Sequence, residues 1–169
     1  MTTISIVECP RDAWQGFHDF IPTSEKIKHL KNLMHCGFHT VDAGSFVSPR
    51  AMPQMADAHE LFAALEESRG KSDTKLLSIV ASEGGARRAA EFSHIDSWGY
   101  PFSVSELFQE RNSRKTIRGA IEDLKRVKDL ALKSNVELVV YLSMAFGNPY
   151  GETYHTDLVL ERLEQALVC

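Results

Sequence analysis

Long hydrophobic runs are absent from this sequence. No apolar stretch is long enough to cross a membrane, and no signal-like apolar segment follows Met1. Long basic runs are absent too, and together with a formal net charge of -4 this disfavours duplex nucleic acid as a main partner. We therefore expect a cytoplasmic protein that works neither in a membrane nor on nucleic acid. Small anionic ligands stay compatible with it, because local arginine clusters can outweigh the net charge.

Cysteine is scarce. The three residues, Cys9, Cys36 and Cys169, cannot all pair, and none belongs to a Cys-x-x-Cys unit. This usage predicts a reduced protein in which Cys9 and Cys36 are buried free thiols. His35, Cys36 and His39 cluster in sequence but lack a second pair of zinc ligands, so we interpret them as the end of a helix.

The spaced glycines of nucleotide-binding loops are missing as well. Gly84 and Gly85 follow an expected strand, but their spacing fits neither dinucleotide nor nucleoside-triphosphate loops, which excludes a Rossmann interpretation. What the chain does have is an ordinary globular composition, with 43% hydrophobic and 25% charged residues among 169. That is enough for one domain over 1–169 with a sizeable core.

Short apolar runs alternate with helical periodicity along the chain. We expect strands over 4–7, 38–43, 76–80, 95–98 and 136–142. We expect helices between Thr23 or Ser24 and Gly37, from near Asp57 to Gly70, and over 83–92, 116–134 and 156–168. Such alternation predicts an α/β fold of parallel strands joined by right-handed crossovers. The last strand is continuously apolar, which predicts burial on both of its faces.

Polar residues gather directly after the expected strands, at Arg11 and Asp12 and over 42–48, 98–106 and 143–150. In barrels and open parallel sheets this edge is where ligands bind. Pro10 should end the first strand, which places a cation and a carboxylate at its exit. Arginine can grip an oxyanion bidentately and aspartate can bind a divalent cation, although a surface ion pair in a loop is the alternative.

A basic patch precedes the long helix over 116–134. It consists of Arg111, Arg114, Lys115 and Arg118. These cations could meet the phosphates of a nucleotide-like carrier at a helix start, and the alternative is a solvated basic face.

Several separated segments resemble one enzyme family. Pro10-Arg11-Asp12 with Gln15 resembles the Pro-Arg-Asp-Gly-Leu-Gln opening of hydroxymethylglutaryl-CoA (HMG-CoA) lyases. Residues 42–50, Asp-Ala-Gly-Ser-Phe-Val-Ser-Pro-Arg, and 53–55, Pro-Gln-Met, resemble the loop after that family's second strand. The loops after the fourth and fifth strands are matched by Ser105-Glu106-Leu107-Phe108 with Asn112, and by Ser143 with Gly147, Pro149 and Tyr150. Their order and spacing make the resemblance specific, and it spans nearly the whole chain.

The resemblance implies a fold and a chemistry. The family belongs to the pyruvate carboxyltransferase-like TIM barrels of eight strands, of which this chain would hold about the first five strand-helix units, a partial TIM (β/α) barrel. The implied reaction cleaves a 3-hydroxy-3-methylglutaryl thioester, an acyl-CoA, to acetyl-CoA and acetoacetate with a divalent cation, Mg²⁺ or Mn²⁺. An open partial barrel also leads us to expect a homo-oligomer.

The resemblance also assigns roles to individual residues. Asp12 would be a metal ligand, and Arg11 would stabilise the thioester enolate and position the substrate. Asp42 stands where the family usually has glutamate and would orient Arg11. Arg11, Gln15, Ser45 and Ser105 would bind substrate.

The sequence also departs from the family pattern. Ala13-Trp14 replaces Gly-Leu, which predicts bulk at the mouth of the site, and Val80-Ala81 replaces Pro-Asn. The family's remaining metal ligands, a His-x-His pair and an asparagine, and its cysteine in a glycine-rich loop lie beyond the fifth strand. No His-x-His occurs here, and Cys169 is not in a glycine-rich loop.

These departures leave more than one hypothesis open. The first is an HMG-CoA lyase-like chain that is catalytically incomplete by itself. The alternative is a truncated homologue that acts as a non-catalytic binding or assembly module. A citramalate-type synthase is disfavoured because residues 45–55 resemble the lyases.

Overall fold

The computed structural model describes residues 4–70 and 72–168, so Cys169 lies outside the described part of the chain. The elements follow one another as β1 (Val7–Glu8), α1 (Pro10–Gln15), α2 (Thr23–Leu33), β2 (Thr40–Ser45), the 3-10 helix η1 (Pro53–Met55), α3 (Ala58–Arg69), β3 (Lys75–Ile79), α4 (Glu83–Ala89), β4 (Ser97–Ser103), α5 (Glu106–Ser113), α6 (Ile117–Ser134), β5 (Glu137–Ser143) and α7 (Thr156–Val168).

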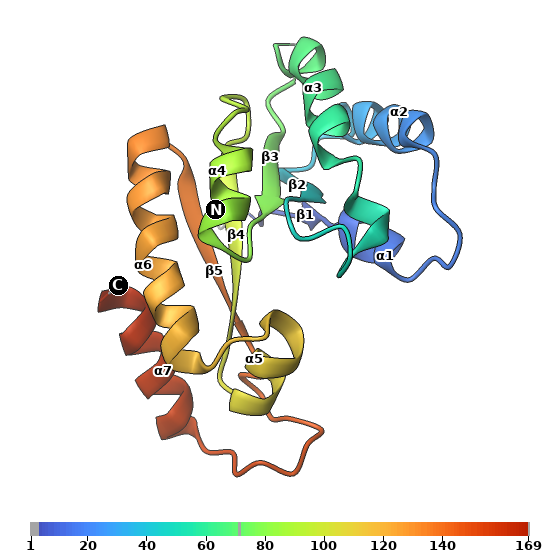
Figure 1. Cartoon of the computed structure of the whole chain (residues 1–169). Helices are drawn as coiled ribbons and strands as arrows, with labels where there is room; N and C mark the ends of the chain where they lie inside the picture. Colours follow the sequence, from blue (N-terminus) through green and yellow to red (C-terminus); the bar gives the residue numbers. More distant parts are fainter. Residues whose placement is uncertain (1–3, 71, 169) are drawn as a thin grey trace.

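All five strands belong to one parallel sheet in the order β1-β2-β3-β4-β5. Each strand pairs with its neighbours in sequence, and the helices lie in the crossovers between them (Figure 1). The sheet curls into a half-barrel, so the predicted α/β fold with a partial TIM barrel is confirmed. Parallel strands joined in this way place their carboxyl ends at one edge, and β4 and β5 run downward toward this edge in Figure 1.

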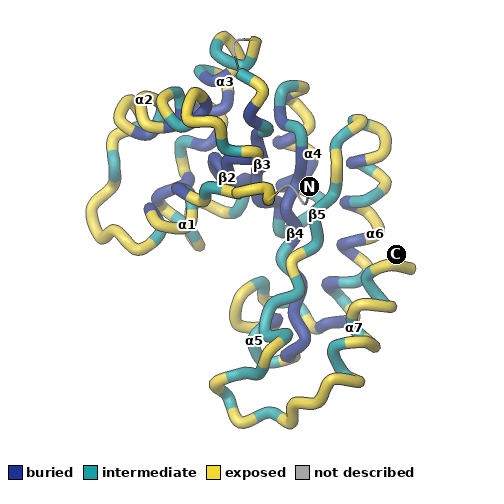
Figure 2. Tube along the Cα trace, turned by 180° about the vertical axis from the view of Figure 1, so that it is seen from behind, coloured by how far each residue is buried: buried dark blue, intermediate teal, exposed yellow. Residues whose placement is uncertain are grey.

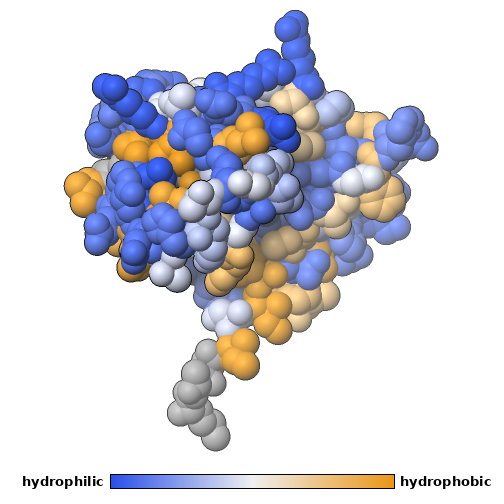
Figure 3. Space-filling model, turned by 90° about the horizontal axis from the view of Figure 1, so that it is seen from below, coloured by the Kyte–Doolittle hydropathy of each residue, from blue (hydrophilic) through white to orange (hydrophobic). Residues whose placement is uncertain are grey.

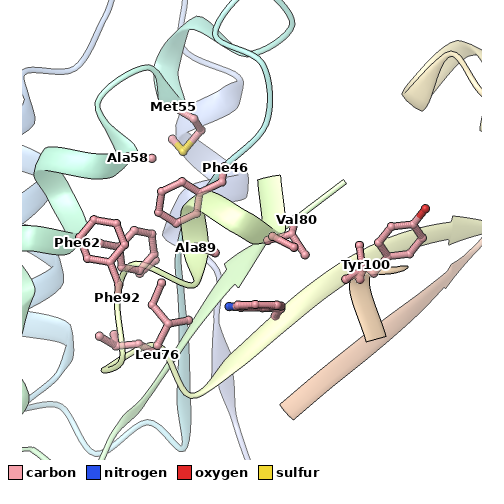
Figure 4. Packing of buried hydrophobic residues seen from close by; sticks show 14 of the residues in the cluster. Phe46, Met55, Ala58, Phe62, Leu76, Val80, Ala89, Phe92 and Tyr100 are labelled. Atoms are coloured by element: carbon pink, nitrogen blue, oxygen red, sulfur yellow. The ribbon is translucent and has the colours of Figure 1, made fainter. Parts of the chain in front are cut away.

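Three phenylalanines form the centre of the core beside β2 and β3. The rings of Phe46, Phe62 and Phe92 lie with centroids 5.3 to 6.0 Å apart (Figure 4). Phe46 belongs to the loop that follows β2, and its carbonyl oxygen accepts a hydrogen bond of 2.6 Å from Arg88 Nη2 of α4. A Cβ atom on Gly85 would lie 2.7 Å from the same oxygen, so α4 can approach this loop only with glycine there. Core packing thereby fixes a loop at the carboxyl edge.

Side-chain caps start three of the helices. Ser82 Oγ accepts from Gly85 N at 3.1 Å, as expected for α4, and Thr116 Oγ1 accepts from Gly119 N at 3.1 Å at the start of α6. Ser105 caps α5 by accepting from Phe108 N at 3.0 Å. Helix α2 begins at Thr23 after Pro22 and has no side-chain cap.

The first and fourth strands differ from their predicted positions. β1 covers Val7–Glu8 instead of 4–7, and Pro10 begins a helix instead of a loop, because proline is well accommodated in the first turn of a helix. β4 covers Ser97–Ser103 instead of 95–98, so most of the stretch over 98–106 lies within β4 and not after it. Gly99 and Pro101 within β4 hide its strand character in the sequence, because glycine and proline are depleted in strands.

The last strand is not buried on both faces. The residues of β5 are half-buried or exposed, and β5 is an outer strand of the sheet (Figure 2). Apolar residues Ile4, Ile6 and Val7 are also exposed at the opposite edge. Figure 3 shows hydrophobic atoms at the surface among hydrophilic ones on the face seen from below. No helix in the described part of the chain is long and apolar enough to cross a membrane.

Candidate functional site

A short helix carries the candidate site residues of the first strand. β1 ends at Glu8, and α1 presents Arg11 toward the neighbouring strand β2. Arg11 Nε lies 3.2 and 3.1 Å from the two carboxylate oxygens of Asp42, and Arg11 Nη2 lies 2.6 Å from Asp42 Oδ2. The strand register shifts directly after Asp42, between Asp42 and Gly44, and such irregularities redirect side chains near sites. The structure thus brings together Arg11 and Asp42, 31 positions apart.

This ion pair is shielded from solvent. The Asp42 side chain is 1% exposed and that of Arg11 is 14% exposed. Burial raises the pKa of Asp42, and the hydrogen bonds and charge of Arg11 oppose this rise. Burial works against the charged form of Arg11, but the bonds and charge of Asp42 outweigh it and raise the pKa of Arg11. The guanidinium is therefore a permanent cation with a fixed orientation.

Asp12 stands at the solvent side of the pair. Its carboxylate lies 3.2 Å from Arg11 Nη1, and its side chain is 71% exposed. Residues 4–70 and 72–168 contain no group of three or more histidine, cysteine, aspartate or glutamate side chains that could hold a metal ion. Both oxygens of Asp42 are used by Arg11, which leaves the exposed carboxylate of Asp12, itself bonded to Arg11 through Oδ1, where a divalent cation needs about six oxygen ligands. These residues do not by themselves fit a complete metal site.

Tyr141 of β5 lies near the pair and was missed in the sequence. Burial raises the pKa of Tyr141, the charges of Asp42 and Cys9 add to the rise, and Arg11 opposes it, so the phenol lies within electrostatic reach of all three. A Cβ atom on Gly99 would lie 2.7 Å from Tyr141 Cε2, so glycine in β4 makes room for the ring. The two-residue period of β5 around Ser143 is the signal that could have identified this position.

Cys9 and Cys36 are exposed, so the predicted burial of both thiols is wrong. Cys9 lies between β1 and α1, and its pKa is raised by partial burial and by the nearby carboxylate of Asp42. Cys36 Sγ lies 3.3 Å from the carbonyl oxygen of Asn32 in the turn after α2.

The serine candidates are engaged by the fold. Ser45 is 1% exposed, and its hydroxyl lies 3.4 Å from the carbonyl oxygen of Ile79. Ser105 is 4% exposed, caps α5 and donates to Glu152 of the loop after β5. Gln15 is half-buried at the end of α1. The structure thus places Gln15 on the same helix as Arg11 and gives both serines structural hydrogen bonds.

Two further expectations change with the structure. Trp14 is 8% exposed and packs edge-on against His29 of α2 at 6.0 Å, so its bulk enters the core and not the mouth of the site.

In the basic patch, Lys115 donates to the carbonyl oxygen of Ala81 at 3.1 Å and to Asp123. Arg111 lies 4.9 Å from the centroid of the Tyr150 ring. Lys115 is therefore engaged by the fold, whereas Arg111, Arg114 and Arg118 are exposed, as the solvated basic face would have them.

Comparison with known proteins identifies related sequences, although no family model matches. The HMG-CoA lyase of Gallus gallus mitochondria is 31% identical over 148 residues, which cover 87% of this chain and 48% of that protein. A 3-hydroxy-3-isohexenylglutaryl-CoA/hydroxymethylglutaryl-CoA lyase of Pseudomonas aeruginosa is 30% identical over 83% of this chain and 46% of its own length. The chain therefore spans about half the length of the curated relatives it matches.

Solved structures give the same result. The HMG-CoA lyase of Bacillus subtilis has a TM-score of 0.89 at 27% identity, over 98% of this chain and 54% of that chain. The HMG-CoA lyase of Acinetobacter baumannii, in complex with coenzyme A and 3-methylmalate, has a TM-score of 0.86 at 26% identity, over 99% of this chain and 55% of that chain.

Proposed function

Because this chain is a homologue of the HMG-CoA lyases and folds as a partial barrel of that kind, we propose that it is a lyase-like carbon-carbon bond-cleaving unit. Its reaction, in a complete barrel, is the cleavage of a 3-hydroxy-3-methylglutaryl thioester to acetyl-CoA and acetoacetate. The A. baumannii lyase binds coenzyme A, which supports an acyl-CoA as the substrate class. Residues 1–169 act as one domain in this proposal, and a cytoplasmic location remains a prediction from the cysteine usage.

One observation carries the proposal, the guanidinium of Arg11 fixed by Asp42 at the carboxyl edge of the sheet. Two of its nitrogens are held by Asp42, while Nη1 lies toward the exposed Asp12. A cation of fixed orientation can stabilise the oxyanion of a thioester enolate without reorganising during the reaction. We assign Arg11 to enolate stabilisation and substrate positioning, and Asp42 to the orientation of Arg11. Gln15 on the same helix is assigned to substrate binding.

The remaining assignments rest on the resemblance to the lyases. Ser45 and Ser105 are assigned to shaping the substrate site through the backbone that they hold, because their hydroxyls already make structural contacts. Asp12 is assigned as one ligand of Mg²⁺ or Mn²⁺ in the complete barrel. The described residues do not complete that metal site, so no step here depends on the metal.

The outer strands β1 and β5 leave two unpaired edges. Open edges with exposed apolar residues favour pairing with another polypeptide, and we propose a homo-oligomer.

Titration calorimetry with Mg²⁺ or Mn²⁺, with and without HMG-CoA, followed by an assay of acetoacetate release, tests the proposed function. Metal binding with turnover supports an active lyase, and we expect Arg11→Gln to lower that turnover by about a hundredfold or more while the fold survives. Wild-type turnover in a folded Arg11→Gln protein contradicts the assigned role. Neither binding nor product from the wild-type chain supports the alternative, a non-catalytic binding or assembly module.

A further inference from the structure

Lys26 in α2 is a charged residue with no exposed surface, its side chain being 0% accessible to solvent. Its Nζ lies 3.1 and 3.0 Å from the carboxylate oxygens of Asp57 and donates to the carbonyl oxygen of Gln54. It also lies 4.1 Å from the centroid of the Phe20 ring. A buried ammonium is costly unless it is fully partnered, and these partners come from two segments, the turn around η1 and the chain that leaves α1.

Gln54 binds the second of these segments directly. Its Nε2 donates to the carbonyl oxygens of Phe17 at 3.2 Å and Asp19 at 2.6 Å, and its Oε1 accepts from Ile21 N at 3.1 Å. Gln54 is 5% exposed, so these bonds are sheltered from water. One side chain therefore satisfies three backbone groups of residues 17–21 and ties them to the turn that follows the β2 loop.

The helix before this segment cannot hold its own position. α1 has six residues and no side-chain cap, and it follows a strand of two residues. Isolated helices of this length are unstable in water, so tertiary contacts must place α1. Trp14 packing on α2 is one such contact, and the attachment of residues 17–21 fixes the end of the segment that follows α1. Arg11 lies on this helix.

We propose that Lys26 and Gln54 are positioning residues that fasten residues 17–21 to η1 and thereby hold Arg11 of α1 in register with Asp42. Neither residue touches the pair, and both act through α1. The proposal rests on the proposed function only in treating Arg11 and Asp42 as the site.

Hydrogen exchange and a carboxyl titration test the proposal without using turnover. Lys26→Met keeps the apolar stem and removes the charge, and Gln54→Met removes the bonds to residues 17–21. The matched control is Arg69→Met, which removes an ion pair of 2.7 Å with Asp96 at the amino ends of the strands. Amide exchange is followed over 10–21, and the titration of Asp42 is followed by the carbon-13 shift of its carboxyl group.

We expect Lys26→Met and Gln54→Met to speed exchange over 10–21 by about tenfold or more, since Lys26 makes charge-assisted hydrogen bonds and the loss of Gln54 leaves three sheltered backbone groups without their partner. The Asp42 titration should move to higher pH as Arg11 is released, and Arg69→Met should change neither observable. If Lys26→Met lowers global stability but changes neither the exchange over 10–21 nor the titration of Asp42, the proposal is overturned. Should Lys26→Met fail to fold, Asp57→Asn, which removes the partner's charge and keeps its shape, is measured against the same two outcomes. A chain without lyase activity but with the expected exchange would refute the proposed function and leave this inference standing.

Discussion

Removing the charge of Arg11 should destabilise the fold in a way that depends on pH. Arg11→Met deletes the guanidinium but keeps an apolar stem, and it leaves Asp42 with a buried carboxylate that has lost its hydrogen-bond donors. The Asp42 side chain is 1% exposed, so water cannot replace those donors without a rearrangement. The variant therefore reports how strongly the structure depends on this pair.

The size of the effect follows from burial. Breaking a buried ion pair by removing one partner costs about 3 to 5 kcal/mol, because an uncompensated charge remains. Arg11 is 14% exposed, which places the expected loss near the lower figure, about 3 kcal/mol at pH 7. Replacing both partners, Arg11→Met with Asp42→Leu, should recover most of that loss, since apolar pairs of similar volume can substitute for buried ion pairs. Asp12→Asn is the control, and its exposed pair should contribute at most about 1 kcal/mol.

The pH dependence has a definite sign. Burial raises the pKa of Asp42 above its ordinary value, and Arg11 opposes this rise, so removing Arg11 raises the pKa of Asp42 further. A carboxyl whose pKa is raised by folding favours the folded state below its unfolded pKa, and that contribution is lost as the pH rises through the folded pKa. Arg11→Met should therefore lose less stability at pH 4 than at pH 7.

Urea unfolding of the wild type, both single variants, the double variant and Asp12→Asn at pH 4 and pH 7 measures these terms. A coupling energy near zero in the double-mutant cycle would refute the reasoning, as would a loss for Arg11→Met below about 1 kcal/mol at both pH values. Either result would mean that the pair contributes little more than a surface contact.

Three other perturbations follow from local geometry. A Cβ on Gly99 would lie 2.6 Å from Ile79 Cδ1, so Gly99→Ala should cost about 1 to 3 kcal/mol in urea unfolding, whereas Gly84→Ala, which has room, should be neutral or stabilising. Ser82→Ala removes the cap of α4 and should cost about 1 kcal/mol, and an unchanged midpoint would show that the cap bond to Gly85 is weak. The described strands β1 and β5 each have a neighbouring strand on one side only, so static light scattering should report self-association that increases with concentration. A monomer at every concentration tested would contradict this prediction.

The sequence by itself determined the order of elements and the general location of the site. Periods of 2 and 3.6 residues are local properties, so the alternation of strands and helices, the long α6 and the last helix α7 could be predicted. The parallel arrangement of the strands could then be inferred from the alternation of strands and helices. A helix that connects two successive strands returns the chain to the same end of the sheet, so every carboxyl end lies at one edge. For the same reason, the sequence could predict that Arg11 and Asp12 lie at this edge, after the first strand.

Only the tertiary structure decided which groups meet. Six residues of α1 are too few to encode a stable helix, so Arg11 is placed by contacts with β2 and α2 that no local pattern records. The Tyr141 ring packs against Gly99 of β4, where a Cβ atom would lie 2.7 Å from Tyr141 Cε2, and this contact depends on the register between β4 and β5. The sequence alone predicts Lys26 to be an exposed helix residue, because lysine is rarely buried. Its burial depends on Gln54 and Asp57, which lie about 30 residues away and come into contact with it only in the folded chain.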